Sequence, residues 1–397
     1  MERRRGRGEK RYTRRNMAGA VLLTVLATLC AVLAALWAVV GTEGLAMLEA
    51  FALIQQRFVG EYERSHVLDG AVDGMVEALG DQWSYYLNAE GSALQRQARQ
   101  NTYVGVGVII SYEREEGLLI LSVEEGSPAE AAGLRPGELI AEADGVSLAG
   151  EARYGAVDLI RGEEGTDVTF TVLGGGGASR TVSVTRRAIE SDPVSFALLE
   201  GGVGLVTLKN FFNRSSAQFQ EAVETLLDQG ADALVFDLRN NPGGYLHELT
   251  AMLDYLLPEG PIFRSRNRAG RELVTESDAS CVEVPMAVLV NGDSYSAAEF
   301  FAAGLLERDW AVVVGTRTSG KGYSQQNYPL VSGGSLNLST NAYFTGEGHS
   351  LVGAGVTPDP LVELDEADVP ALLAGVLAHG DDVQLQAALT ALAGPGA

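Results

Sequence analysis

One stretch of alternating apolar segments constrains the fold of this chain more than any other feature. Residues 286–290 predict a buried strand, an apolar helical pattern begins at Ser296, and a second strand is expected over 311–314. A strand, a helix and a strand in this order give parallel strands joined by a crossover helix. The same alternation comes earlier, with a helical pattern over 218–227 and a strand over 233–236. We therefore expect an α/β core.

The composition excludes several classes of function. The formal net charge is −23, whereas binding of nucleic acid requires a basic footprint. The two cysteines, Cys30 and Cys281, cannot supply a disulfide framework. The four histidines are scattered, and none stands at metal-ligand spacing. We therefore expect no nucleic-acid partner, no metal and no cofactor.

The first forty residues predict a membrane anchor. Residues 1–16 are a basic tail, and residues 17–40 contain no charged side chain. As a helix this run would span roughly 36 Å, enough for a hydrocarbon core of about 30 Å. The basic flank predicts a cytoplasmic N terminus in the cell membrane, with everything from Gly41 onward on the outer side. A cleaved signal peptide is the alternative; a buried soluble helix fits poorly beside the flanking arginines.

Residues 41–100 are expected to form a helical arm that ends in an aromatic turn. Apolar side chains recur at helical spacing in two segments, and Ser65 is a candidate N-cap of the second. The pattern predicts an αα-hairpin that ends at Gly80 and packs on its own domain or on a second copy of the chain. The turn over 81–87 is rich in aromatic side chains, which is more typical of packing than of chemistry.

Residues 101–189 predict a compact β-rich unit. With Tyr103-Val104-Gly105-Val106-Gly107-Val108 near its start, Ser127-Pro128-Ala129 and the turn over 133–138, the segment resembles a PDZ domain. The resemblance implies a unit that binds peptide ends, in which the glycine loop would expose N–H groups to a terminal carboxylate and the next strand edge could take the peptide as an added strand. The residues then expected to bind the peptide are Tyr103, Val104, Gly105, Val106, Gly107 and Arg161. The alternatives are that the glycines only permit strand curvature and that Arg161 is simply solvated.

Three residues near the central strand–helix unit point to hydrolysis. Ser296 stands at the start of a helix, Lys321 lies between two glycines, and Gln325 follows four residues later. Serine is a weak nucleophile until a base takes its proton, and a neutral lysine is the candidate base because no histidine motif is suitably placed. The reference pKa of lysine is about 10.4, so Lys321 is expected to be buried or crowded. Gln325 could fix the direction of the lysine side chain.

Backbone amides near Ser296 could stabilise a negatively charged intermediate. The N–H groups of Gly243 or Gly244, together with that of Ala297, are the candidates for an oxyanion hole of acyl transfer. The start of a helix favours negative charge at the same place.

The same motifs allow other interpretations. Ser296 and Glu299 match a capping box, which satisfies N–H groups at a helix start without any catalysis. Ser294 is a rival nucleophile on composition alone. Residues 315–321 nearly spell a phosphate-binding loop, but Gly322 stands where that loop needs serine or threonine. This departure argues against an NTPase.

The order of these motifs resembles the C-terminal processing peptidases, also called tail-specific proteases, over residues 51–361. The motifs are DLRNNPGG at 237–244, SYSAAE at 294–299, GKGYSQ at 320–325 and GAGVTPD at 353–359. The resemblance implies that Ser296 rather than Ser294 is the nucleophile. It also makes Lys321 the general base and Gln325 the residue that orients it. Tyr295 departs from the family pattern, because a small residue is common at that position.

The resemblance also implies an architecture and a function. The expected fold is α/β, with a crotonase/ClpP-like β-α-β peptidase core over 190–365, an inserted PDZ-like domain, an N-terminal transmembrane helix, and C-terminal helices over 366–397. The expected function is a membrane-anchored serine endopeptidase that cleaves proteins near free, apolar C-terminal tails. The helical arms suggest a homodimer. A PDZ-bearing scaffold or sensor with a silent or gated peptidase domain is the alternative, and an acyl-CoA enzyme is a weaker one.

Overall fold

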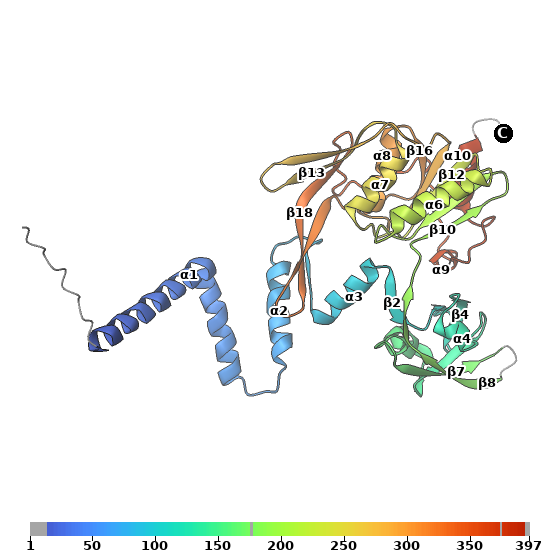
Figure 1. Cartoon of the computed structure of the whole chain (residues 1–397). Helices are drawn as coiled ribbons and strands as arrows, with labels where there is room; N and C mark the ends of the chain where they lie inside the picture. Colours follow the sequence, from blue (N-terminus) through green and yellow to red (C-terminus); the bar gives the residue numbers. More distant parts are fainter. Residues whose placement is uncertain (1–13, 175–177, 374, 394–397) are drawn as a thin grey trace, which may run out of the picture. The chain divides into compact units, whose positions relative to one another are not determined.

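The computed structural model describes residues 14–174, 178–373 and 375–393 (Figure 1). Most of the basic tail expected over 1–16 and most of the four-glycine turn of the β-rich unit lie outside these described residues. Backbone contacts divide the chain into two units, Met1–Leu68 and Asp69–Ala397. The second unit holds every residue predicted to take part in catalysis or peptide binding.

The first unit is helical. Helix α1 (Arg14–Arg57) is interrupted at Gly41, whose φ of 65° and ψ of −173° are not helical. Helix α2 (Arg64–Glu77) follows and extends into the second unit. Among the described residues, no helix combines the length and the apolar character needed to cross a membrane. The span expected over 17–40 therefore has no support in the structure.

The core of the second unit is a mixed five-stranded sheet. Its strand order is β10-β11-β12-β15-β16, and every neighbouring pair except β10 with β11 is parallel. The strands are β10 (Val194–Leu198), β11 (Val203–Leu208), β12 (Ala233–Asp237), β15 (Met286–Val290) and β16 (Ala311–Gly315). The parallel strands expected from the sequence are confirmed.

Helices cover both faces of this sheet. One face packs against α6 (Ser215–Asp228), α7 (Leu246–Leu256) and α8 (Ala297–Glu307), through side chains such as Phe236 and Val288. The opposite face packs against α10 (Val383–Ala393), through alternate strand residues. This two-sided burial explains why the strand sequences are continuously apolar rather than alternating.

The carboxyl ends of β12, β15 and β16 lie at one edge of the sheet, because parallel strands share a direction. The register aligns Asp237 with Leu289, and Val290 with Gly315. The loops that leave these ends carry the NPGG motif, the Ser296 turn and the Lys321 loop, respectively. Three motifs that are far apart in sequence are thus brought to one place, where open α/β sheets bind ligands.

A second sheet was not predicted from the sequence. Its strand order is β1-β18-β13-β14, with β17 paired to β18. The strands are β1 (Tyr85–Leu87), β13 (Gly260–Asn267), β14 (Glu272–Ser277), β17 (Tyr323–Pro329) and β18 (Ser335–Thr345). The aromatic turn therefore feeds a strand that pairs with β18, and the lysine loop runs directly into β17.

The inserted β-rich unit has its own buried core. Its main sheet has the order β3-β4-β5-β7-β8, with β6 paired to β5, so β3 is an edge strand. These strands are β3 (Val108–Ser111), β4 (Leu118–Val123), β5 (Leu139–Ala143), β6 (Val146–Ser147), β7 (Asp167–Leu173) and β8 (Ser179–Thr185). A separate pair is formed by β2 (Thr102–Gly105) and β9 (Arg187–Glu190). The free edge of β3 is where strand addition was expected.

Short helices complete the second unit. They are α3 (Ala89–Arg99), α4 (Pro128–Ala131), the 3₁₀-helix η1 (Gly150–Gly155), α5 (Ala156–Ile160) and α9 (Val369–Leu373). Helix α3 was not predicted. The helices expected over 367–379 and 383–392 correspond to α9, which is shorter, and to α10.

Candidate active site

The Ser296 turn holds an unusual backbone conformation. Ser296 precedes α8 with a φ of 59° and a ψ of −121°. A positive φ is uncommon for residues other than glycine and marks a position that its surroundings hold in place. Tyr295 N–H donates to Asn241 O at 3.1 Å, which ties this turn to the NPGG loop. The serine is therefore held by contacts from the neighbouring loop.

The structure separates the two candidate nucleophiles. Ser294 is fully buried, and its hydroxyl donates to Leu238 O at 2.7 Å and accepts from Asn291 N–H at 2.9 Å. Ser296 is only partly buried. Ser294 thus joins two loops of the core, whereas Ser296 stands where a substrate could reach it.

The Glu299 carboxylate links the backbone of the serine to that of the lysine. Its carboxylate is fully buried and lies in the first turn of α8. It accepts hydrogen bonds from Ser296 N, Lys321 N, Gly320 N and Thr318 Oγ1, at 2.8, 2.8, 2.6 and 2.6 Å. A buried carboxylate is stable only when its oxygens are satisfied in this way. The predicted capping contact from the Ser296 N–H is present, but the same carboxylate also fixes the lysine loop.

Lys321 is held close to Ser296 through its backbone. Ser296 N and Lys321 N both donate to the same oxygen of Glu299. Burial lowers the pKa of Lys321 to about 8, with a smaller lowering by Arg99, while Glu299 and Asp81 oppose the change. A pKa near 8 gives a useful fraction of neutral amine near neutral pH, as a general base requires.

The lysine amine does not touch the serine hydroxyl in this structure. Among the described residues, no hydrogen bond or ion pair joins Lys321 Nζ to Ser296 or to any other side chain. Instead Nζ lies 4.9 Å from the centroid of the Trp83 ring and 5.5 Å from that of Tyr295. The arrangement therefore has the base near the nucleophile but turned toward aromatic rings.

Gln325 lies at the start of β17 and does not bind the lysine here. Its amide donates to Tyr323 O at 2.9 Å and to Ser339 Oγ at 3.3 Å. No hydrogen bond links it to Lys321 among the described side chains. The predicted orienting contact is thus not made in this arrangement.

The two candidate oxyanion glycines differ in their surroundings. A Cβ added to Gly243 would lie 2.8 Å from Ala297 N and 3.0 Å from Ser296 Cβ, so Gly243 packs directly on the serine turn. Its own N–H, however, donates to Asn241 Oδ1 at 2.8 Å. Gly244 packs instead on the backbone of Phe211. The Gly243 amide can therefore act beside Ala297 N only after it gives up its hydrogen bond to Asn241.

A buried ion-pair network supports the base of the NPGG loop. Arg239 is 9% exposed, and its guanidinium lies 2.6 Å from Asp237 and 2.7 Å from Asp382. It also donates to Gln384 Oε1 at 3.0 Å, which links the loop to the start of α10. Sequence reasoning placed Asp237 and Arg239 in a motif but missed their partners, which lie more than a hundred residues away.

The predicted peptide-binding loop is built around a left-handed glycine. Gly107 has a φ of +83°, and a Cβ there would lie 2.3 Å from Ser127 Cβ. The carbonyl of Val106 accepts from Ala129 N–H at 2.8 Å, so the loop packs on the start of α4. Glycine is required at position 107 by both the conformation and the contact.

Two other predicted peptide contacts lie near an acidic side chain. Tyr103 Oη donates to Glu124 Oε2 at 2.7 Å. Burial and Glu124 raise the pKa of Tyr103, while Arg161 acts in the opposite direction, which places Arg161 within electrostatic reach of this loop. Tyr103, Val104 and Gly105 pair with β9, so one edge of their strand is already occupied.

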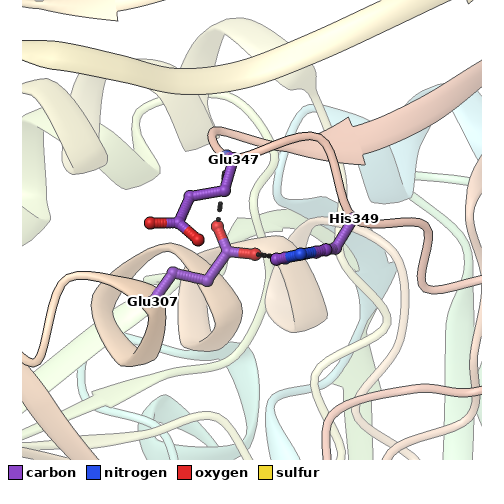
Figure 2. A group of neighbouring side chains, drawn as sticks. All are labelled: Glu307, Glu347 and His349. Atoms are coloured by element: carbon purple, nitrogen blue, oxygen red, sulfur yellow. Dashed lines mark hydrogen bonds and ion pairs between the residues drawn. The ribbon is translucent and has the colours of Figure 1, made fainter.

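A second cluster of side chains joins the end of α8 to the turn after β18 (Figure 2). Glu307 binds His349 Nδ1 at 2.7 Å, accepts from Thr345 Oγ1, and lies 3.4 Å from Glu347 N. Glu307, Glu347 and His349 have ligand atoms within 4.8 Å of one another. The Glu307 carboxylate is already satisfied by these donors, and it raises the pKa of His349. These hydrogen bonds therefore attach the 345–349 turn to the end of α8.

That turn leads into the segment that packs on the lysine loop. Gly353 N donates to Gly320 O at 2.9 Å, and Val356 N donates to Thr318 Oγ1 at 2.7 Å. The histidines appeared scattered in the sequence, and the packing of the end of α8 beside the turn after β18 brings His349 to Glu307. No spacing in the sequence signals this contact.

Comparison with known proteins defines the class to which this fold and site belong. Peptidase family S41 matches residues 202–362, which include β11, β12, β15 and β16 with their loops. A PDZ domain matches residues 119–174, and the N-terminal domain of the activating protease CtpB matches residues 42–91. The class is therefore that of S41 peptidases with a PDZ domain.

Individual relatives narrow the class. A "Carboxy-terminal-processing protease" of Bartonella bacilliformis (strain ATCC 35685) is 31% identical over 324 residues, which cover 79% of this chain and 74% of that protein. The solved "Photosystem II D1 C-terminal processing protease" is 28% identical with a TM-score of 0.50, over 87% of this chain and 93% of that one. The chain belongs to the carboxy-terminal-processing proteases of peptidase family S41.

A further relative shows that the match is partial in length. A "Probable CtpA-like serine protease" of Staphylococcus aureus (strain COL) is 30% identical over 317 residues, or 79% of this chain. The match spans 63% of that relative, which is less than two thirds of its length.

Proposed function

We propose that this protein is a serine endopeptidase that captures the C-terminal tails of proteins and cleaves near them. Ser296 attacks the scissile carbonyl, neutral Lys321 takes the serine proton and returns it to the leaving amine, and water then hydrolyses the acyl-enzyme. Ala297 N–H and a glycine amide of the NPGG loop stabilise the oxyanion. Gln325 orients the lysine once Nζ turns toward the serine.

One observation carries this proposal. The loops after β12, β15 and β16 converge, and a single buried carboxylate, that of Glu299, binds the backbone of both Ser296 and Lys321. The reacting side chains therefore start from backbones that share one hydrogen-bond acceptor. A swing of the Lys321 side chain toward Ser296 completes the pair without moving the sheet.

The proposed substrate is an extended, apolar and partly unfolded tail. The Val106–Gly107 turn and the free edge of β3 support this assignment, because strand addition needs an extended backbone and a terminal carboxylate needs free N–H groups. Glu124 beside the loop disfavours a second negative charge close to the carboxylate. Tails that end in apolar residues are therefore preferred over acidic ones.

The test is cleavage of a reporter protein with a disordered apolar tail, using the full chain. Mass spectrometry of the products should show loss of a C-terminal piece, and an amidated tail should be cut more slowly because its carboxylate is gone. Ser296→Ala and Lys321→Ala should each abolish turnover. Unchanged turnover in both variants would end the proposal.

A second candidate is a scaffold or sensor whose peptidase domain is gated. The position of Lys321 Nζ over two aromatic rings, with no hydrogen bond to Ser296 among the described residues, favours this alternative. A fluorophosphonate probe discriminates the two: labelling of Ser296 supports the peptidase. Tail binding without labelling, even when tail peptide is in excess, supports the scaffold.

The location and assembly of the protein are further parts of the proposal. The basic residues before the uncharged run over 17–40 support a cytoplasmic N terminus and a catalytic part outside the cytoplasm. Membrane attachment is tested by carbonate extraction of the full chain, and sequencing of the mature N terminus tests cleavage. Exposed apolar side chains on α2 and just after it, such as Leu68, Met75 and Leu79, support pairing of two copies, which light scattering tests.

A further inference from the structure

The Lys321 amine lies over the faces of two neighbouring aromatic rings, those of Trp83 and Tyr295. Its Nζ is 4.9 Å from the Trp83 centroid and 5.5 Å from the Tyr295 centroid, and the two rings are 6.4 Å apart at 31°. Both distances are within the range of about 6 Å at which an ammonium is attracted to a ring face. Among the described residues the amine forms no hydrogen bond or ion pair, and its contacts are with these two ring faces.

The backbone that carries each ring is held by contacts within the protein. The backbone N–H of Trp83 donates to Asp81 Oδ1 at 3.1 Å, and the neighbouring Ser84 Oγ accepts from Ser339 N–H at 3.0 Å. Strand β1 then continues this turn along β18. Tyr295 is held by its N–H bond to Asn241. The backbone at both rings is therefore set in place by strand pairing and loop contacts that do not involve the lysine.

The attraction depends on the charge of the amine. A ring face attracts an ammonium through its negative quadrupole, whereas a neutral amine gains little from the same position. We propose that Trp83 and Tyr295 are positioning residues that hold protonated Lys321 away from Ser296 and release it once it has lost its proton. This inference rests on the proposed function, because it describes how the base of that reaction is stored.

The other groups around the amine fix the sign of the effect. Glu299 on α8 and Asp81 before β1 favour the ammonium, while burial and Arg99 on α3 oppose it. The balance holds the pKa of Lys321 at about 8. Both charge states of Lys321 are therefore populated near pH 8. A modest change in the attraction by the rings then alters the fraction of Lys321 that is neutral.

Tyr295 supplies the second ring face, and a small side chain at this position would leave Lys321 with the Trp83 ring alone. The role of Trp83 emerges only when β1 pairs with β18 and brings the ring over the lysine loop.

The first experiment measures the pKa of Lys321 without any catalysis. In the full chain carrying Ser296→Ala, trace acetylation of Lys321 is followed by peptide mass spectrometry between pH 6 and 10. We expect Trp83→Leu, which keeps an apolar wall but removes the ring face, to lower the midpoint by about one pH unit. Trp83→Phe, which keeps a ring face, should stay close to the parent.

A second pair of variants guards against misfolding of the first. Tyr295→Leu and Tyr295→Phe change the second ring. We expect the leucine variant to lower the midpoint of Lys321 acetylation and the phenylalanine variant to leave it close to that of the parent. A midpoint that stays fixed or rises in the leucine variants overturns the inference. The inference is also overturned if the midpoint of a phenylalanine variant falls as far as that of its leucine counterpart, because the ring face would then be irrelevant.

A kinetic experiment separates this inference from the proposed function. With Ser296 restored, the acidic limb of kcat/KM for tail cleavage should move down by the same amount in the leucine variants. If cleavage survives Ser296→Ala, the proposed function fails while the acetylation result still stands. If cleavage needs Ser296 but the pH profile of kcat/KM does not move in the leucine variants, the proposed role of the two rings is wrong while the proposed peptidase function stands.

Discussion

Replacing Glu299 by glutamine removes the acceptor that joins the two halves of the site. Each carboxylate oxygen accepts two hydrogen bonds: Ser296 N and Lys321 N bind Oε2, while Gly320 N and Thr318 Oγ1 bind Oε1. A glutamine side chain keeps the shape but presents one NH₂ group, which cannot accept. Two of the four donors therefore face another donor, whichever way the amide turns.

The expected cost follows from these contacts. An unsatisfied buried donor costs about 1–3 kcal/mol, so Glu299→Gln should lower the free energy of unfolding by roughly 2–6 kcal/mol. Urea unfolding measures this change. Thr318→Val is the matched control, because it leaves the carboxylate in place and removes the Oγ1 that donates to Glu299 and accepts from Val356 N–H. It leaves one buried donor, the Val356 N–H, unpaired and should cost about 1–3 kcal/mol. A Glu299→Gln variant within about 0.5 kcal/mol of the parent, the range of an ordinary surface substitution, would refute the reasoning.

Three further changes test other parts of the site. Gly243→Ala places a Cβ 2.7 Å from Tyr295 O at a φ of +80°, so kcat for tail cleavage should fall about 10²-fold or more as the oxyanion donors shift; a kcat within twofold of the parent contradicts this. Ser294→Ala removes two buried hydrogen bonds and should destabilise the fold by about 1–3 kcal/mol in urea, while a serine probe still labels Ser296. Because Glu307 raises the pKa of His349, its contribution is complete below the unfolded pKa of about 6.5 and is lost as pH rises through the higher folded value. The stability gap between the parent and His349→Gln should therefore be largest near pH 5 and close at alkaline pH; a gap that widens with pH refutes the assignment.

The sequence predicted the α/β core because its signals are local and strong. The runs at 233–236, 286–290 and 311–314 are continuously apolar, as strands covered on both faces must be, and all three form parallel strands. The alternation of strands and helices then fixes where their loops must meet. The positions of the Ser296 turn and the Lys321 loop at one sheet edge follow from this order.

The second sheet was missed because its strands lack such a pattern. Strands β13, β14 and β17 are largely half-exposed and polar, with residues such as Arg264 and Gln326 along them. The pairings of β18 with β13 and with β1 join residues far apart in the chain, which no local periodicity reports. The same reason hid α3, whose composition is polar.

The support of the site was only partly visible in the sequence. Glu299 was recognised as a capping residue, yet its bonds to Gly320 and Lys321 depend on the return of β16 beside β15. Trp83 was assigned to packing, because its approach to Lys321 requires the pairing of β1 with β18. Residues that react can be found by motif, whereas residues that position them depend on tertiary contacts.

The most direct test of the Ser296–Lys321 pair is the rate of fluorophosphonate labelling as a function of pH. In the full chain, the probe should attach to Ser296, with a rate that rises through about pH 8 as Lys321 loses its proton. Lys321→Met should slow labelling by about 10²–10⁴-fold, the usual contribution of a general base. Labelling at another residue, or equally fast labelling of Ser296 in Lys321→Met, would contradict the account.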